Sequence, residues 1–148
     1  MNKSERKERL KDIVRMIDDT IYSVECDKST IDEAFKKIED LSWFLDENCM
    51  CPSDFDAEDM KTDILEEYID ANSDIEEFMD EITSLTEEIY EEMSEMKEGS
   101  SRREEWEEFY YNLEDCDTSL DVKDNEIYDI DDLVQRLDNI KADIRNLI

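Results

Sequence analysis

Residues 73–98 have the sequence SDIEEFMDEITSLTEEIYEEMSEMKE, in which large apolar side chains recur at steps of three and four. This spacing places them along one face of an α-helix, while paired acidic residues cover much of the remaining surface. Ser73 and Glu76 have the spacing of a capping box, so a helix either begins there or continues with a kink. The apolar stripe consists of Ile75, Phe78, Met79, Ile82, Leu85, Ile89, Met93 and Met96.

Three further helices are expected on the N-terminal side of this stretch. The first covers about residues 4–24, and the second opens at a capping box formed by Thr30 and Glu33. A break is expected at 48–52, because its proline lacks an amide hydrogen and restricts the residue before it. The third helix then begins near residues 53–54. The three apolar faces are, in order, Leu10, Ile13, Val14, Ile17 and Ile21; Ile31, Ala34, Phe35, Ile38, Leu41 and Leu45; and Met60, Ile64, Leu65, Tyr68 and Ile69.

Two helices are expected on the C-terminal side. Gly99 is suited to the left-handed conformation that ends many helices, so it is the expected C-terminal cap of the central helix. Ser101 with Glu104 opens the next helix. A polar connection follows at 115–126, and the last helix covers about 129–147. The two apolar faces are Trp106, Phe109, Tyr110 and Leu113, and then Ile130, Leu133, Val134, Leu137, Ile140 and Ile144.

These patterns predict an all-α protein in which residues 1–148 form a single domain. A bundle of five to six amphipathic helices is expected, and the heptad-like stripe over 75–96 is compatible with an elongated form. No apolar run approaches the ~18 residues of a membrane span, and no signal-peptide core is present. The protein is therefore expected in the cytoplasm, with its four cysteines as free thiols: Cys26, Cys49, Cys51 and Cys116.

Negative charge is concentrated in the middle of the chain. There are 47 acidic residues, 17 basic residues and no histidine, which gives a net charge of −30. Residues 1–37 are neutral, 38–98 carry −21, 99–132 carry −10, and 133–148 carry +1. The acidic surface is therefore expected over 39–132. Such a surface excludes direct binding to nucleic-acid phosphates and to anionic membranes.

The acids within this region occur in adjacent pairs. Residues four apart lie above one another on a helix, so Glu76 stacks with Asp80 and Glu87 with Glu91. Each like-charged pair destabilises a helix by about 0.2–0.5 kcal/mol, and no lysine is interspersed to offset this cost. We therefore expect these carboxylates to bind a partner. The candidate residues are Glu76, Glu77, Asp80, Glu81, Glu87, Glu88, Glu91 and Glu92, followed by Glu104, Glu105, Glu107 and Glu108.

The density of acids along the central helix is close to that of phosphates on DNA. Residues 74–98 would span roughly 37 Å as a helix and carry eleven acids, which is about one per 3.4 Å. One strand of B-DNA carries a phosphate about every 3.4 Å. A helix of this kind can therefore present a phosphate-like line of charge.

In size, helical pattern, net charge and paired acids over 39–132, the chain resembles the small acidic DNA-mimic proteins of phages and other mobile elements, which include anti-restriction and anti-CRISPR proteins. The resemblance implies an inhibitor that occupies the basic nucleic-acid channel of a bacterial defence nuclease in the host cytoplasm. A CRISPR effector is favoured over a restriction enzyme. The alternative is an acidic adaptor, antitoxin or chaperone for a basic protein partner, and a homodimer is compatible with either function.

Catalysis and metal binding are not expected. Without histidine the chain lacks the usual general base and most zinc or iron ligand sets. Most acids lie opposite the apolar stripes, whereas a metal site in a bundle needs isolated acids on apolar faces. Cys49 and Cys51 also lack the Cys-x-x-Cys spacing of structural zinc sites. We therefore expect no enzyme activity, no cofactor and no metal.

Residues 115–126 partly match a calcium-binding loop. Glu126 occupies position twelve, but Leu120 replaces the glycine of the sharp turn and Lys123 occupies position nine. These departures favour an acidic loop over a specific calcium site. The residues at positions one, three, five and seven are Asp115, Asp117, Ser119 and Asp121.

Two groups of side chains have alternative interpretations. The basic N-terminal residues could form a weak nucleic-acid patch, but interspersed acids favour pairing with the acidic middle of the chain. The aromatic residues widen two apolar faces, which is typical of bundle core, although an anchor at a protein interface is the alternative. The basic residues are Lys3, Arg6, Lys7, Arg9, Lys11 and Arg15, and the aromatic residues are Trp43, Phe44, Trp106, Phe109, Tyr110 and Tyr111.

Overall fold

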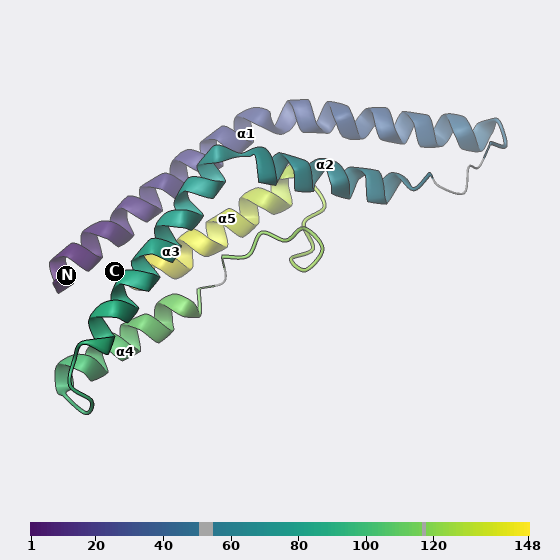
Figure 1. The fold of residues 1–148 in the computed structure, drawn as a ribbon. Coiled ribbons are helices and arrows are strands. Elements are labelled where there is room, and N and C mark those ends of the chain that lie inside the picture. The colour runs from purple at the N-terminus through teal and green to yellow at the C-terminus, as the bar shows by residue number, and fades with distance from the viewer. Residues whose placement is uncertain (51–54, 117) are drawn as a thin grey trace.

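The computed structural model describes residues 1–50, 55–116 and 118–148, which form five α-helices and no strand. They are α1 (Lys3–Glu47), α2 (Ala57–Ala71), α3 (Ser73–Ser94), α4 (Ser101–Glu114) and α5 (Ile130–Arg145). The predicted all-α bundle is therefore confirmed. α1 packs against α5, α3 and α2, while α3 also packs against α4, and the bundle is elongated along α1 (Figure 1). None of the helices in these ranges has the length and apolar character that a membrane span requires.

α1 is one helix of 45 residues where two were expected. Residues 24–31 contain neither glycine nor proline, and the buried positions on both sides keep one helical period. Thr30 is exposed within the helix, so the predicted break at its capping box with Glu33 is wrong. The helix instead begins after Asn2, whose side chain accepts a hydrogen bond from the Glu5 amide. The Glu5 carboxylate accepts one from the Asn2 amide in return, which completes a capping box.

The starts of the later helices lie close to their predicted positions. Asn72 rather than Ser73 caps α3, and Ser100 rather than Ser101 caps α4. The Asn72 side-chain oxygen accepts hydrogen bonds from two amides of the first turn of α3, and the Ser100 hydroxyl accepts one from the Arg103 amide. A helix otherwise leaves these amides unpaired. Asp129 caps α5, as the predicted start implies. A break between α2 and α3 is therefore real, with Asn72 ending one helix and beginning the next.

The ends of α3 and α1 can be compared with the predicted positions at Gly99 and at residues 48–52. Gly99 has a φ of 78° but lies beyond the end of α3, in a turn over 97–100, so it does not cap that helix. Positive φ at this place in a turn favours glycine. The break predicted at 48–52 agrees with the end of α1. Residues 51–54, which include Pro52 and the predicted start of the following helix, lie outside the described residues.

The hydrophobic core lies where α1, α3 and α5 meet. Full burial of a large aliphatic or aromatic side chain contributes about 1.5–3 kcal/mol, so these contacts fix the orientation of α3. Its apolar stripe faces inward and its acids face α1 or solvent. Fully buried core side chains include Leu10, Ile13, Ile17, Phe78, Leu85, Ile89, Leu133, Leu137 and Ile140.

The second half of α1 and the antiparallel α2 extend beyond the other helices as a two-helix arm (Figure 1). The hydroxyl of Tyr68 in α2 donates a 2.7 Å hydrogen bond to Asp27 in α1. Near the tip of the arm, Trp43 and Phe44 are 66% and 54% exposed, because α1 runs past the end of the bundle. The prediction of core packing is therefore wrong for these two residues and for Tyr111 of α4, which is also exposed, whereas Trp106 is buried as predicted.

Candidate partner-binding surface

The eight acids predicted as binding residues on α3 lie in two rows. Successive residues of a helix are rotated by about 100°, so each adjacent pair contributes one acid to each row. The outer row lies opposite the buried stripe, and its four side chains are all exposed. The inner row lies on the side of the helix nearer the start of α1. The outer row is Glu76, Asp80, Glu87 and Glu91, and the inner row is Glu77, Glu81, Glu88 and Glu92.

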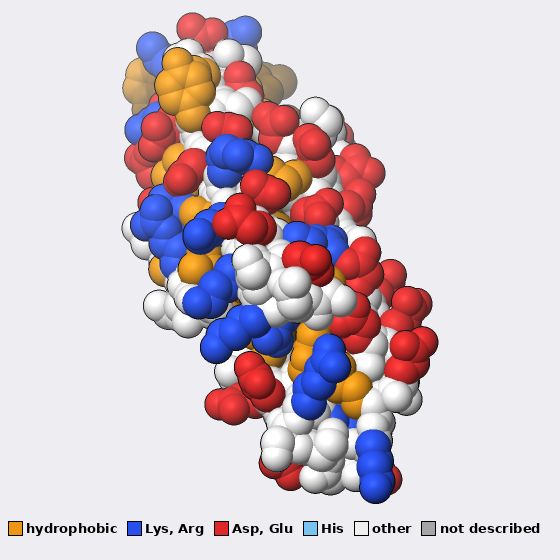
Figure 2. Space-filling view, turned by 90° about the vertical axis from the view of Figure 1, so that its left-hand side faces the viewer, with side chains coloured by type: hydrophobic (Ala, Val, Ile, Leu, Met, Phe, Trp, Pro, Cys, Tyr) orange, Lys and Arg blue, Asp and Glu red, His pale blue; other side chains and the backbone are white. Residues whose placement is uncertain are grey.

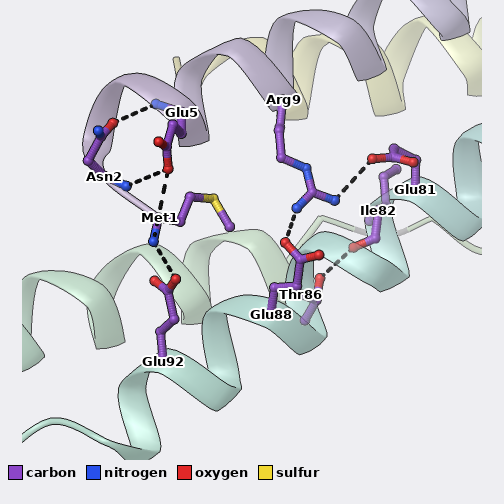
Figure 3. Close-up of polar contacts among 9 residues, drawn as sticks. All are labelled: Met1, Asn2, Glu5, Arg9, Glu81, Ile82, Thr86, Glu88 and Glu92. Carbon is purple, nitrogen blue, oxygen red and sulfur yellow. Dashed lines mark hydrogen bonds and ion pairs between the residues drawn. The ribbon is translucent and has the colours of Figure 1, made fainter.

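The N-terminal end of α1 neutralises most of the inner row (Figure 3). The Arg9 guanidinium lies between two acids: Nη2 donates to Glu81 Oε1 at 3.0 Å, and Nη1 donates to Glu88 Oε2. The amino group of Met1 pairs with the Glu92 carboxylate. Three of the four inner-row acids are therefore held in ion pairs with Met1 or Arg9. The fourth, Glu77, is exposed and has no such pair among the described residues.

A second set of ion pairs involves the acids of α4. Arg6 is 4% exposed and stacks over the rings of Trp106 and Phe109, at 4.3 and 4.7 Å from their centroids. Burial lowers the pKa of the Arg6 guanidinium, and the charge of Glu105, 3.7 Å away, opposes this shift. Glu107 accepts a 2.9 Å hydrogen bond from Arg103. The predicted pairing of N-terminal bases with the acidic middle is therefore confirmed for Arg6 and Arg9.

Seven of the twelve predicted residues remain available to a partner. All seven are exposed, and none pairs with a lysine, an arginine or the amino terminus within the described part of the chain. Figure 2 shows basic side chains lying among acidic ones on one side of the molecule, with acidic side chains dominating one edge. We call these seven residues the unpaired acids: Glu76, Glu77, Asp80, Glu87, Glu91, Glu104 and Glu108.

Ion pairing makes the line of charge sparser than the sequence suggests. α3 has 22 residues, a length of roughly 33 Å, and carries nine acids, of which three are neutralised by α1 or Met1. The six others give about one charge per 5.5 Å, against about one per 3.4 Å on a DNA strand. The spacing match therefore does not hold in detail, although the outer row still places four exposed carboxylates on one face of α3.

A tyrosine cluster lies beside the acids at the junction of α3 and α4. The ring centroids of Tyr90 and Tyr110 are 5.8 Å apart, and those of Tyr110 and Tyr111 are 5.6 Å apart. Tyr90 and Tyr111 are each 59% exposed. Tyr90 was missed as a candidate residue because it falls outside the apolar stripe. A large aromatic side chain on the polar face, next to Glu91, is the signal that could have identified it.

The loop before α5 uses its acids to order its own backbone. The Asp121 carboxylate accepts hydrogen bonds from the amides of Lys123 and Asp124, both at 3.0 Å. Leu120 and Val122 are buried on either side of it. No group of three potential metal ligands occurs among the residues that the structure describes, and Asp117 lies outside them.

The described cysteines are dispersed through the structure. Cys26 and Cys49 are exposed free thiols, Cys116 is buried, and Cys51 lies outside the described residues. Burial raises the pKa of the Cys116 thiol to about 11, which favours the unreactive protonated form at neutral pH.

Comparisons with known proteins do not identify a relative. No family model matches the chain, and no curated protein or solved structure is significantly similar to it.

Proposed function

We propose that this chain is a binding inhibitor that mimics DNA and occupies the basic nucleic-acid channel of a bacterial defence nuclease, with a CRISPR effector favoured over a restriction enzyme. The observation that carries this proposal is the outer row on α3. Four exposed carboxylates lie along one rigid helix, and no basic side chain in the described residues neutralises them. A helix that had only to fold would not retain this repulsion.

The mechanism is competition for the arginines and lysines that bind phosphates. Carboxylates of the outer row replace phosphates at these side chains, and the release of condensed counterions contributes to affinity. The net charge of −30 also attracts a basic channel at long range and accelerates association. Both effects weaken as salt shortens the range of electrostatic interactions, so inhibition should fall steeply with ionic strength.

The fixed orientation of α3 supports this mechanism. Its apolar face is buried against α1 and α4, and three of its four inner-row acids are held by Arg9 and Met1. The outer row is therefore presented without the cost of ordering a flexible segment on binding. The exposed tyrosines Tyr90 and Tyr111 lie near enough to supply apolar contacts that add specificity.

The test begins with capture of partners from a bacterial lysate at low salt, followed by elution at rising salt. The eluted protein is then assayed for DNA binding and cleavage with and without this chain. A mimic must be displaced by excess duplex DNA and must lose its inhibition at ~0.5 M salt. Inhibition that persists unchanged at that salt concentration contradicts the electrostatic mechanism.

A charge-matched pair of variants locates the binding surface. Neutralising the outer row with E76Q, D80N, E87Q and E91Q should weaken inhibition by about tenfold or more. The control variant D19N, E25Q, D32N and E33Q removes four exposed acids of α1 and has the same net charge as the outer-row variant. Equal losses in the two variants would show that total charge, not the outer row, is responsible.

An acidic adaptor, antitoxin or chaperone for a basic protein is the second candidate function. The exposed Trp43 and Phe44 at the tip of the arm favour this second function. DNA has no feature that two exposed aromatic side chains would imitate, so mimicry does not account for them. Capture of a basic protein that DNA does not displace would support this function over mimicry.

A further inference from the structure

A groove of about 610 Å³ lies where the end of α2, the start of α3 and the loop before α5 meet. Its floor is apolar and is formed by Ile69, Ile75, Met79, Leu120 and Val122. Four of these side chains belong to the hydrophobic core, and Met79 is partly exposed in the groove. The volume falls within the range of about 300–1,000 Å³ that is typical of ligand sites.

Five carboxylates line the same groove: Glu66, Asp70, Glu76, Asp80 and Asp121. Among the described residues, none of the five forms an ion pair with a lysine or an arginine. The Asp121 carboxylate is oriented by the amides of Lys123 and Asp124, so it is fixed on the loop. The groove therefore combines an apolar floor with a strongly negative lining that the fold leaves uncompensated.

Lysine and arginine side chains have the chemistry that matches this combination. Each carries a long methylene stem that packs on apolar surface and a cationic head that stays among polar or charged groups. A phosphate or another acidic ligand would be repelled, and a purely apolar ligand would leave the carboxylates unpaired. A second copy of this chain is also disfavoured, because each copy carries a net charge of −30.

We propose that this groove binds a lysine- or arginine-bearing segment of the protein partner, with methylene stems on the floor and cationic heads among the carboxylates. The proposal rests on the proposed function, because Glu76 and Asp80 belong both to the groove and to the outer row. It adds a contact that DNA itself lacks, since a phosphate backbone has no apolar floor for a side-chain stem. Binding in the groove therefore depends on the length of the side-chain stem as well as on charge, whereas simple charge attraction depends on charge alone.

The test uses a hexaarginine peptide as probe and the methionine methyl signals of the full chain as readout. The seven methionines give seven ¹³C-methyl signals, and Met79→Leu assigns the one in the groove. Titration should shift the Met79 signal in a saturable way, while Met16, which lies in α1 outside the groove, stays unchanged. A peptide of six 2-amino-3-guanidinopropionic acid residues has the same charged head groups as hexaarginine but short stems, and it should bind about fivefold more weakly.

Charge-matched variants provide the second readout. Glu66→Gln, Asp70→Asn and Asp121→Asn together should weaken hexaarginine binding by about tenfold. Asparagine can accept the same backbone hydrogen bonds at position 121, so the loop is expected to remain folded. The control D19N, E25Q and D32N removes three exposed acids of α1 and should change affinity by less than about twofold.

Three outcomes overturn the proposal: an unmoved Met79 signal, equal binding of the short-stem peptide, or equal losses in the two triple variants. None of these outcomes affects the salt and DNA competition tests of inhibition. Conversely, a saturable Met79 response in a chain that fails to compete with DNA would keep the groove and remove DNA mimicry. Failure of the groove and failure of the proposed function are therefore distinguishable.

Discussion

Arg9 is the residue that decides which carboxylates of α3 remain available to a partner. It binds Glu81 and Glu88 with two different nitrogen atoms, and thereby ties the start of α1 to the middle of α3. The outer row, one residue earlier in each pair, lies beyond its reach and stays exposed. Together with the amino group of Met1, which binds Glu92, this guanidinium separates three ion-paired acids of α3 from the exposed acids of the outer row.

Arg9→Gln should lower the free energy of unfolding by about 1 kcal/mol, because it leaves two inner-row acids unpaired beside their neighbours. Urea denaturation at low salt measures the loss, which should shrink as salt screens the repulsion. Arg15→Gln is the matched control, since Arg15 is 71% exposed and pairs only with Asp12 within the described residues. Equal destabilisation by both substitutions would contradict a special role for Arg9.

Tyr68 gives the contact between α2 and α1 a defined pH dependence. Burial, followed by the hydrogen bond to Asp27, raises the pKa of Tyr68 above its ordinary value of 10.0. The folded protein therefore keeps this proton at a pH where the unfolded chain loses it. The contribution of Tyr68 to the free energy of unfolding is fully present below about pH 10 and is lost as the pH rises above that value.

Tyr68→Phe should consequently cost about 1 kcal/mol at pH 7, and the difference from the unchanged protein should diminish above pH 10. Urea denaturation of both proteins from pH 7 to 11 provides the measurement. Tyr22→Phe serves as the control, because Tyr22 is 71% exposed. A difference that is constant across this pH range would argue against the hydrogen bond as its source.

At the scale of helices, the structure distinguishes residues that cap a helix from residues that merely resemble caps. Asn72 accepts hydrogen bonds from two amides of α3, whereas Thr30 lies exposed inside α1. Asn72→Ala should therefore lower the free energy of unfolding by about 1 kcal/mol. Thr30→Ala should leave it unchanged or slightly raised, because alanine favours a helix interior. Thermal unfolding followed by circular dichroism tests both, and a loss in Thr30→Ala would favour two separate helices.

The outer row should be a source of instability in α3. It contains two like-charged pairs four residues apart, Glu76 with Asp80 and Glu87 with Glu91. Neutralising all four acids should therefore raise the free energy of unfolding by about 0.5–1 kcal/mol, while it weakens inhibition. Such opposite effects on stability and binding are expected where charge is retained for a partner. A variant that loses both stability and inhibition would instead assign the outer row a structural role.

Over the whole molecule, the net charge of −30 makes stability depend on ionic strength. The Debye length falls from about 30 Å at 0.01 M salt to about 8 Å at 0.15 M, so repulsion between distant carboxylates is screened in this range. The midpoint of thermal unfolding should therefore rise as sodium chloride is added from 0.01 to 0.15 M. A midpoint that falls would indicate that the internal ion pairs of Arg9 and Arg6 outweigh the general repulsion.

Most of the helices and the position of the charge along the chain follow from the sequence alone. The stripe from Ile75 to Met93 is buried as its period predicts, except for the partly exposed Met79, and the ends of α4 and α5 follow local signals, because helix formation depends on neighbours within a few residues. The same local signals misplaced the Thr30 cap, since capping spacing also occurs inside a helix that tertiary contacts continue.

Which acids are exposed as free charge depends on how the helices pack. The ion pairs of Arg9 and Met1 with α3 join residues separated by 72, 79 and 91 positions, and no local pattern encodes such contacts. The same holds for the groove, whose carboxylates come from α2, α3 and the loop before α5. The charge of each residue is fixed by its identity, but whether it is neutralised depends on which helix packs beside it.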